Sequence, residues 1–526
     1  MNINLSVLDL TIIGVYFIGM ITLGLYLSRR TKGADDYFLA GRNMVWPFIG
    51  LSLFASNISS TTLVGLSGDA YATGISVYAY EWMAAVILVV FAVFFLPLIL
   101  RQQVFTMPEF LGRRYDGRVR VYFTLLSLFL SVAVETAGSL FAGALVLKLL
   151  LPDVPLWQTM TVLALIAGFY TLTGGLRAVM FTDAVQTILL LIGSLTITAI
   201  ALNEVGGIGA VLDAVPKEKL SLIRPPGDEG IPWPGLLTGV PLLGFYYWAT
   251  NQAIVQRALA AKSVNHGRWG ALFAGFLKLL PLFIMVLPGT MAILLYPELP
   301  RADLVFPTLM FDLLPTGLLG LTLAGFLAAI MSQIDSALNS ASTMVTMDFV
   351  RPSRPHLTSQ QLSAVGRYVM AGFLLFAVLW APFISSFRSI FSYIQVMFSY
   401  AVPPVVALFL MGTFWSRANA EGGFAGAMVG LLVGVVAFLL IEVASVIQLH
   451  FLYSAPILFI VAAAAIVGVS LATQAPDPVK TAPLLWRPSL LKEESAELRG
   501  LPFWQNYRVQ AACLLLAVAL IVYWFR

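Results

Sequence analysis

The chain has 526 residues, of which 59% are hydrophobic and only 11% are charged, and its mean hydropathy is +0.90. A soluble protein has about 25% charged residues, so the composition excludes a soluble globular protein and indicates one that crosses a membrane many times. The single cysteine, Cys513, excludes an internal disulfide framework and argues against a cysteine metal site. The net charge of +4 does not indicate a nucleic-acid partner, because the basic residues lie in loops whose sidedness explains them.

Apolar stretches long enough to span a bilayer follow one another along the whole chain. We predict an all-α polytopic membrane protein with fourteen transmembrane helices, near 6–28, 46–73, 77–100, 121–150, 156–174, 180–203, 235–257, 268–296, 315–348, 366–386, 389–415, 422–444, 450–472 and 507–525. The second and seventh of these are the least uniform, because both are rich in Gly, Ser, Thr, Asn or Pro. The polar stretch 473–506 contains LLKEESAELRGL, which predicts a short amphipathic helix along the membrane surface.

Lysine and arginine are distributed unevenly over the predicted loops. Counted over alternate loops, beginning with SRRTKGADDYFLAGRN, one set holds 22 of the 30 basic residues and the opposite set holds six. The remaining two, Lys148 and Lys278, lie inside predicted spans. Positive charges gather on the cytoplasmic side of membrane proteins. The sequence therefore predicts a multi-pass protein of the plasma (inner) membrane with both termini outside.

The second apolar segment contains FASNISSTTLVGLSGDAYATG, with five Ser or Thr residues between Ser56 and Thr62 and with Gly65 and Gly68 close behind. A continuous membrane helix gains nothing from this composition. A helix that is broken at mid-membrane exposes backbone carbonyls, which are tolerated where they line a cavity and which can coordinate a cation. We therefore predict a broken helix here.

Residues 331–342, MSQIDSALNSAS, form a second polar segment in an apolar surrounding. Steps of three and four place several oxygen-bearing side chains on one helical face: Ser332, Asp335, Ser336, Asn339 and then Ser342 or Thr343. Sodium is a hard ion that takes oxygen ligands, as hard cations do in general. This stripe is therefore predicted to form one wall of a cation site, opposite the broken helix.

Ionisable side chains inside the predicted spans indicate function, because inserting each one costs about 2.5–3.5 kcal/mol. They are Glu81, Glu135, Asp183, Lys278 and Asp335. Lys278 lies too deep for its side chain to reach the membrane surface. Glu135 is expected to pair with a neighbouring helix, and Asp183 is interpreted either as a functional residue or as one at the membrane edge. No HExxH, GxSxG or CxxC motif occurs, so we do not expect an enzyme.

Several longer motifs resemble the solute:sodium symporters, and most closely their sodium/sugar (glucose/galactose-type) cotransporter branch. They are FASNISSTTLVGLSG, YEWMAA, GGLRAVMFTDAVQT, YYWATNQAIVQRALAAK, GFLKLLPLFIMVLPG, AAIMSQIDSALNSASTMVTMDF and YIQVMFSYAVPPVVALFLMGTFW. The resemblance runs to about residue 425 and implies one transporter domain over 1–526. It implies two inverted five-helix repeats of the LeuT type, at 46–205 and 235–415, after an extra helix at 6–28 and before accessory helices at 422–525.

The resemblance also implies ion sites. The main sodium ligands would be the carbonyls of Ala55, Ile58 and Ala329 and the hydroxyl of Ser332, and a second serine is expected where this chain has Gln333. This departure puts ordinary sodium affinity in question. A second cation position, nearer the cytoplasm, would be formed by Asp183, Ser336 and Asp335.

The resemblance implies a sugar site in the same region. Its hydroxyl-binding residues would be Asn57, Glu81, Lys278 and Gln395, its stacking inner gate Tyr247, and its outer lid Leu66, Tyr80 and Phe391. Two positions depart from the sugar branch, since Thr62 stands where Gln or His is usual and Gly244 where Asn or Thr is usual. These departures suggest a different sugar or polyol. No cationic anchor for a carboxylate substrate is found in the broken-helix region.

The function expected from the sequence is sodium-coupled import of a monosaccharide, either a hexose or a related sugar or polyol, by alternating access. Its partners would be the sugar, Na⁺ as the coupling ion and the lipid bilayer, with no cofactor. One alternative keeps the fold but couples to protons, or to nothing, through Asp335, Asp183 or Glu135. The other alternative is a sensor that binds sugar without moving it.

Overall fold

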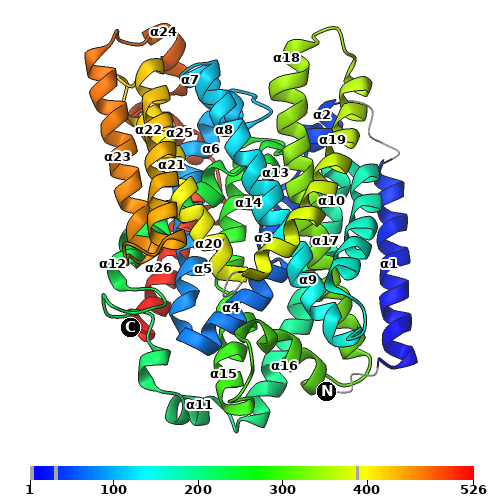
Figure 1. Cartoon of the computed structure of the whole chain (residues 1–526). Helices are drawn as coiled ribbons and strands as arrows, with labels where there is room; N and C mark the ends of the chain where they lie inside the picture. Colours follow the sequence, from blue (N-terminus) through cyan, green and yellow to red (C-terminus); the bar gives the residue numbers. More distant parts are fainter. Residues whose placement is uncertain (1–4, 29–33, 387–389) are drawn as a thin grey trace.

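The computed structural model describes residues 5–28, 34–386 and 390–526, and within these residues it contains helices and no strands, apart from two isolated backbone bridges (Figure 1). In a bilayer the backbone N–H and C=O groups have no water to bond, so a chain rich in Leu, Ala, Val and Ile satisfies them within helices. The all-α prediction is confirmed for the described residues.

Each of the fourteen predicted segments is mainly helical over its described residues. The helices that form them are α1 (Val7–Ser28), α3 (Trp46–Asn57), α4 (Ser60–Thr73), α5 (Ala79–Val90), α6 (Leu96–Arg101), α8 (Gly117–Phe129), α9 (Ala137–Leu150), α10 (Leu156–Glu204), α12 (Trp233–Phe245), α13 (Gln252–Leu259), α14 (Val264–Leu277), α15 (Leu287–Leu295), α17 (Leu318–Met344), α19 (Ser359–Trp380), α20 (Ile390–Ala401), α21 (Pro403–Phe414), α22 (Ala420–Phe438), α23 (Phe451–Ala472) and α26 (Tyr507–Trp524). Shorter helices connect them, namely α2 (Ala34–Leu39), α7 (Met107–Arg114), α11 (Ile208–Ala214), α16 (Val305–Leu313), α18 (Arg351–Ser353), α24 (Pro478–Thr481) and α25 (Pro488–Leu498).

The number of spans is only partly fixed by the structure. Nine helical stretches of the described residues are long and apolar enough to cross a membrane, or eleven if each of two bent pairs is one span. Two shorter apolar stretches, Val7–Met20 and Leu156–Gly168, add to these. The second is the first part of the unbroken helix α10, whose later part, Ala178–Glu204, is a full span. The count of fourteen therefore stays a prediction.

The predicted break in the second segment is present. Helix α3 ends at Asn57, α4 starts at Ser60, and their axes differ by 59°. Ile58 has non-helical dihedral angles (φ −78°, ψ 74°) and Ser59 is extended. The Ser59 hydroxyl accepts a hydrogen bond of 3.3 Å from the Thr62 backbone N–H, so it caps the new helix, as serine often does. The serine-rich composition thus ends one helix and starts the next.

The seventh predicted segment is interrupted in a similar way. Helix α12 passes into a π-helical turn, η6 (Tyr246–Thr250), and the backbone is extended at Asn251 before α13 begins. The Asn251 side chain caps α13 by accepting a bond of 2.8 Å from Ala253 N–H. A third bend, of 47°, separates α20 from α21 at Val402, just before two prolines that cannot continue a helical ladder.

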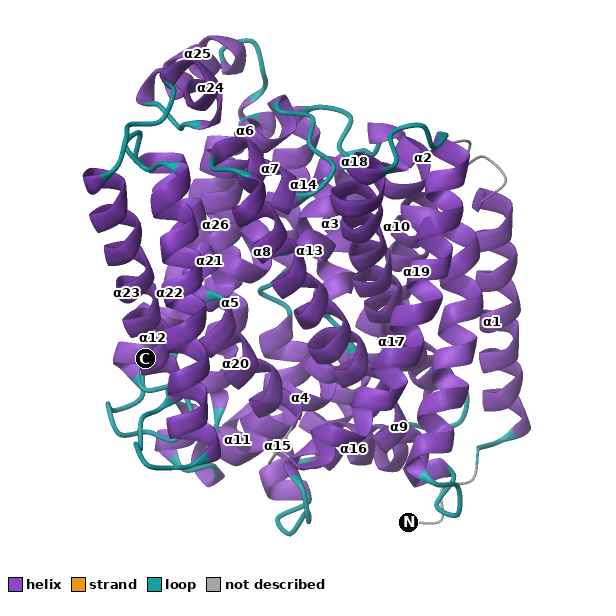
Figure 2. Ribbon diagram, turned by 45° about the horizontal axis from the view of Figure 1, so that its top comes forward, coloured by secondary structure: helices purple, strands orange, loops and turns teal. Residues whose placement is uncertain are grey.

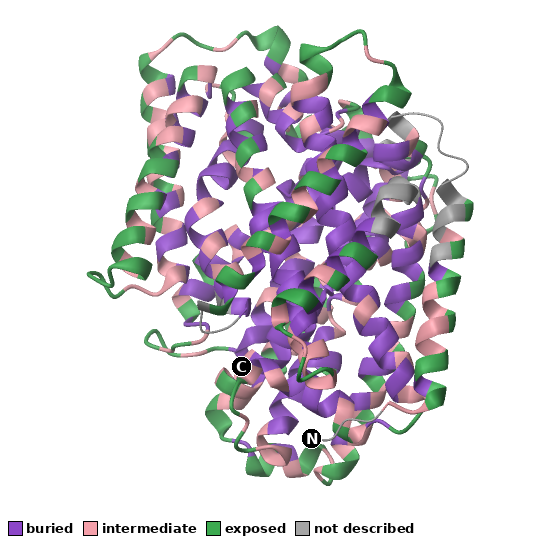
Figure 3. Cartoon of the chain, turned by 45° about the vertical axis from the view of Figure 1, so that its right-hand side comes forward, coloured by how far each residue is buried: buried purple, intermediate pink, exposed green. Residues whose placement is uncertain are grey.

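Helix α17 lies in the interior of the bundle. In α17 and its extension to Ser353, 89% of the most apolar stretch of 18 residues is buried. The same share is 22–28% for the stretches that contain α22, α23 and α26. Figure 3 shows this contrast, with buried residues in the centre of the bundle and exposed residues along the outer helices. Large apolar side chains such as Leu432 and Leu516 are more than 60% exposed, as expected of surfaces that face lipid.

Both chain termini lie towards the end of the bundle that carries α11, α15 and α16, which we name the terminal face (Figure 1). Helices α7, α18, α24 and α25 lie at the opposite end, which we name the basic face because it carries the Lys- and Arg-rich loops (Figure 2). The expected short helix in 473–506 is α25. It is anchored by a buried ion pair of 2.6 Å between Glu494 and Arg268 of α14.

Candidate substrate and ion sites

A central cavity lies beside the break in the α3–α4 pair. It is lined by Asn57, Ser59, Thr61, Thr62, Tyr80, Glu81, Glu135, Leu243, Gly244, Tyr247, Trp248, Gln333, Phe391, Ile394, Gln395 and Phe398. These residues come from the broken pair, from α5, from the π-helical turn η4 (Leu130–Thr136), from the interrupted α12 with η6, from α17 and from α20. The structure therefore brings together most of the sugar contacts that the sequence predicts, although they are up to several hundred residues apart in the chain.

Lys278 contacts two of the residues that line the cavity. Its Nζ lies 2.5 Å from Glu81 Oε2 and also donates to the Asn57 side-chain oxygen. The lysine is fully buried and its Nζ lies 5.1 Å from the centroid of the Trp248 ring. Burial of an ionised group is costly unless it is paired, so Lys278 and Glu81 hold each other in place. Glu81 also lines the cavity, and the pair is neutral as a whole.

Two of the three predicted lid residues lie between the central cavity and a larger vestibule towards the terminal face. Tyr80 and Phe391 line both spaces, and their rings are in edge-to-face contact with centroids 5.3 Å apart. Leu66 is fully buried and lines neither space. Gly65 permits the close approach, since a Cβ there would be 2.9 Å from Phe391 Cβ. The aromatic pair therefore separates the cavity from the vestibule.

Tyr247, the predicted inner gate, lines the central cavity from the π-helical turn η6. Its hydroxyl donates a long hydrogen bond of 3.4 Å to the Ser56 carbonyl, and its ring is tilted against Phe398 with centroids 6.4 Å apart. Gly244, one turn earlier, also lines the cavity, and a Cβ at this position would lie 3.4 Å from Ile87 Cγ1. The ring of Tyr247 is thus placed to contact anything bound in the cavity.

The four main sodium ligands expected from the sequence surround one small cavity. Ala55 and Ile58 reach it from the α3–α4 break, and Ala329 and Ser332 reach it from α17. The cavity holds about 10 Å³, which is close to the space of one water-sized sphere. Two of the lining residues, Ala55 and Ile58, thus stand at the break, where the helical hydrogen-bond ladder is interrupted. Asp335, which is buried on α17, does not line this cavity.

Gln333 lies elsewhere. It lines the central cavity, and its Oε1 is shielded from solvent and accepts no hydrogen bond from the described residues. Successive residues of an α-helix point about 100° apart, so Ser332 faces the ion cavity while its neighbour faces the substrate cavity. The structure thus does not place Gln333 among the residues that line the ion cavity.

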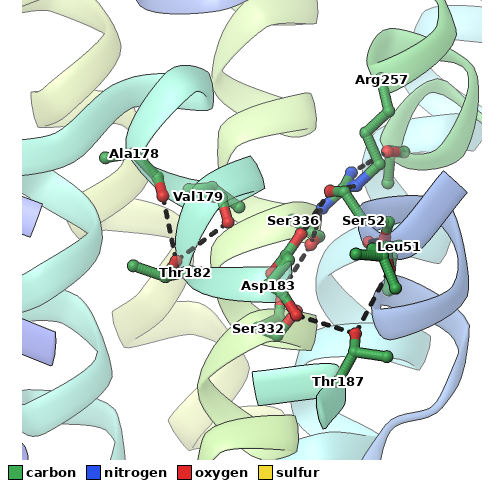
Figure 4. A network of polar contacts seen from close by, with 12 residues as sticks. Leu51, Ser52, Ala178, Val179, Thr182, Asp183, Thr187, Arg257, Ser332 and Ser336 are labelled. Carbon is green, nitrogen blue, oxygen red and sulfur yellow. Dashed lines mark hydrogen bonds and ion pairs between the residues drawn. The ribbon is translucent and has the colours of Figure 1, made fainter. Parts of the chain in front are cut away.

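A buried polar network lies next to the ion cavity (Figure 4). Asp183 of α10 accepts hydrogen bonds of 2.5 Å from both Ser52 and Ser332. Arg257 of α13 lies 3.3 Å from the same carboxylate and also donates to Ser52 and Ser336. Asp183 and Ser336, two of the residues predicted to bind a second cation, therefore already hold a guanidinium group.

Arg257 is the functional residue that the sequence analysis missed. Counting basic residues by loop assigned it to a cytoplasmic loop, yet it is only 1% exposed. The sequence did indicate burial of Arg257. The residue stands in QAIVQRALAA, where the apolar run AIV lies two positions before it and ALAA follows it directly. A buried arginine requires a partner, and Asp183 supplies it.

Comparison with known proteins decides the family. The sequence profile of the sodium:solute symporter family matches residues 37–430. The chain belongs to this family. Its relatives include sodium/myo-inositol cotransporter 2 of Oryctolagus cuniculus, 37% identical over 91% of this chain and 78% of the relative. Sodium/glucose cotransporter 1 of Ovis aries is 35% identical over 93% of this chain and 82% of the relative. The family and these relatives are transporters and not enzymes.

Solved structures of other members of the fold agree with the architecture. A Na⁺-coupled sialic acid symporter, solved in a substrate-bound outward-open state, matches with a TM-score of 0.79 over 90% of this chain and 100% of its own, at 23% identity. Mhp1, a nucleobase-cation-symport-1 family transporter, matches with a TM-score of 0.57 over 86% of this chain and 98% of its own, at 15% identity. The symporter is a multi-pass membrane protein with a LeuT-type fold, as expected.

Proposed function

We propose that this symporter imports a monosaccharide or a related polyol together with sodium, by alternating access of the central cavity to the two sides of the membrane. The observation that carries the proposal is that Glu81, Asn57 and Gln395 line one cavity, with Lys278, which is not itself a lining residue, bound to the first two. Charged and amide groups of this kind bind hydroxyls, and a few convergent polar groups in a largely apolar pocket are typical of a small-molecule site. The sugar and polyol named for the two cotransporter relatives support this substrate class.

Sodium binding would follow from the position of the ion cavity. Ala55 and Ile58 offer carbonyls where the helix is broken, and Ala329 and Ser332 offer a carbonyl and a hydroxyl from α17. Asn57, in the same broken segment, lines the substrate cavity. An ion that fixes this segment would therefore also position a sugar contact, which couples the two binding events.

Arg257 bears on the number of sodium ions. Its guanidinium binds Asp183 and Ser336, where a second cation was predicted. A fixed positive charge there compensates the carboxylate, so we propose that one sodium ion, at the main site, is coupled to each sugar. A proton would be the alternative coupling ion, with Asp335 or Glu135 as its carrier.

The direction of transport follows from the proposed orientation. The terminal face would lie outside the plasma (inner) membrane and the basic face would lie in the cytoplasm, because basic loops stay on the cytoplasmic side. The vestibule beyond Tyr80 and Phe391 would then be the outer entrance. The repeats at 46–205 and 235–415 each start with an interrupted helix, and movement of one repeat against the other would open the cavity to either side.

The experiment that tests the proposal is sugar binding by the purified protein at varied sodium concentration. Because linkage is reciprocal, sodium should lower the Kd for glucose or myo-inositol, and the sugar should lower the Kd for sodium by the same factor. Potassium serves as the control ion. Sugar affinity that is equal in sodium and in potassium, and that follows pH instead, would favour the proton-coupled alternative.

The variant Gln333→Ser tests whether the glutamine, which stands where the family resemblance implies a serine, affects sodium binding. Because Gln333 lines the central cavity and not the ion cavity, we expect Gln333→Ser to leave the sodium activation of uptake unchanged or to strengthen it. The measurement is initial uptake at a series of sodium concentrations. A sodium response that appears only in the variant would mean that Gln333 disables the site in the natural chain.

Tyr247 tests the assignment of the inner gate. Tyr247→Phe keeps the ring and loses the hydroxyl, whose hydrogen bond to Ser56 is long and therefore weak, so uptake should stay close to that of the natural chain. Tyr247→Ala removes the partly buried ring from the cavity wall and should reduce sugar affinity at least about tenfold, because the apolar contact of the ring with the sugar is lost. Equal affinity in the two variants would argue against a stacking role.

A further inference from the structure

The central cavity contains a carboxylate that neither the predicted sugar contacts nor the sodium site uses. Glu135 lies in the π-helical turn η4 (Leu130–Thr136) between α8 and α9, is 5% exposed, and lines the same cavity as Glu81. Its Oε1 accepts a hydrogen bond of 2.7 Å from Asn251 Nδ2. Its Oε2 is shielded from solvent and accepts no hydrogen bond from the described residues.

The buried cations of this region are bound to other carboxylates. Lys278 pairs with Glu81, and Arg257 pairs with Asp183. Within the described part of the chain, the only partner found for Glu135 is the neutral amide of Asn251. Since the Glu81–Lys278 pair is neutral, a cationic ligand beside Glu135 would supply the opposite charge that favours the ionised carboxylate.

A second acceptor without a donor lies on another wall of the cavity. Gln333 Oε1, from α17, is also buried without a hydrogen bond among the described residues. Two such oxygens favour a ligand that brings N–H donors and a positive charge. A protonated amine has three donors and one charge, like the lysine ammonium, whereas a hard metal ion takes about six oxygen ligands. The acceptor set of Glu135 and Gln333 therefore matches an amine better than a metal ion.

The vestibule also carries acidic groups. Its ionisable lining residues are Asp69, Glu229, Arg301 and Asp303. Arg301 pairs with Asp303 at 3.1 Å, Glu229 adds a further acidic group to the lining, and a cleft of one sign attracts ligands of the other sign. A cationic ligand would thus be attracted at the entrance and stabilised in the cavity.

We propose that Glu135 makes the central cavity selective for a hydroxylated ring that carries a protonated amino group, as an amino sugar does. The proposal rests on the proposed function and names its substrate class. The amino group donates to Glu135 Oε2 and to Gln333 Oε1, while ring hydroxyls bind Glu81 and Gln395. The same carboxylate disfavours sugars with an acid group.

Side-by-side uptake of radiolabelled 2-amino-2-deoxyglucose and glucose into proteoliposomes, with an inward sodium gradient, tests the proposal. The natural chain should prefer the amino sugar, and Glu135→Gln should reduce that preference at least about tenfold, in line with the strength of hydrogen bonds to charged groups. The ratio of the two uptakes is read within one protein, so altered folding or turnover cancels. Glu442→Gln is the control, because Glu442 bonds to Tyr400 and does not line the cavity.

An unchanged ratio in Glu135→Gln would overturn the proposal. The proposal would also be overturned if Glu135→Gln lost only the response of glucose uptake to a pH gradient, because Glu135 would then be a proton carrier. Thermal unfolding in detergent with each sugar separates this proposal from the proposed function. If the amino sugar raises the unfolding temperature more than glucose does but sodium drives no uptake, the selectivity is supported and the symport is contradicted. If sodium drives uptake of both sugars without preference, the symport is supported and the selectivity is contradicted.

Discussion

Glu81→Ala is expected to reduce saturable sugar uptake by at least about 100-fold. Removing one partner of a buried ion pair costs about 3–5 kcal/mol, or roughly 150- to 5,000-fold, because the remaining charge has no partner. Here the remaining charge is Lys278, which is fully buried and would keep only Asn57 as an acceptor. The loss would combine a missing sugar contact with a disordered cavity wall. Initial uptake and the Kd for sugar are the measurements.

A charge-neutral variant separates the two effects. Glu81→Gln combined with Lys278→Met removes both charges and should fold close to normally, as measured by its thermal unfolding midpoint, yet it should bind sugar weakly because the polar contacts are gone. Gln395→Ala, which breaks no ion pair, should lose less, about 5- to 150-fold. Near-normal uptake in both Glu81→Ala and Gln395→Ala would show that the sugar does not bind in this cavity.

Arg257→Gln is expected to destabilise the protein strongly and to impair transport. Asp183 is fully buried and Arg257 is its ionic partner, at 3.3 Å. Without the guanidinium the carboxylate would be buried with only two serine hydroxyls as donors, Ser52 and Ser332, and the expected cost is again about 3–5 kcal/mol. The thermal unfolding midpoint in detergent and sodium-driven uptake are the measurements.

Adding Asp183→Asn to Arg257→Gln provides the control, since the pair is then neutral. The double variant should recover much of the lost stability, and the energy of interaction between the two positions follows from the complete cycle. If Arg257 replaces a second cation, the single variant Arg257→Gln should also be stabilised by sodium more than the natural chain is. Additive effects of the two substitutions would contradict direct pairing.

The break in the second helix could be predicted from local composition. Five Ser or Thr residues between Ser56 and Thr62 compete with the helical backbone for hydrogen bonds and favour caps. Ser59 acts in this way, because it caps α4. Asn57, at the same break, accepts a hydrogen bond from Lys278. The sequence therefore contained both the break and its polar lining.

Contacts between distant helices could not be predicted in the same way. The apolar residues around Arg257 indicate that it is buried, but its partner Asp183 lies on a different helix 74 residues away, so the pairing itself could not be predicted. Gln333 was assigned to the ion site by its position in a motif, but the 100° step along α17 turns its side chain towards the other cavity. Leu66 likewise lies in the expected helix without reaching the lid. In each case the orientation of a helix decides the role of the side chain.

The most direct test of the account is radiolabelled sugar uptake into proteoliposomes under separate sodium and pH gradients, with glucose, myo-inositol and 2-amino-2-deoxyglucose as substrates. We expect an inward sodium gradient to drive accumulation of at least one of these substrates above its equilibrium level, and a pH gradient alone to drive none. Accumulation driven by the pH gradient and indifferent to sodium would contradict sodium coupling, and uptake that never exceeds equilibrium under either gradient would contradict symport itself.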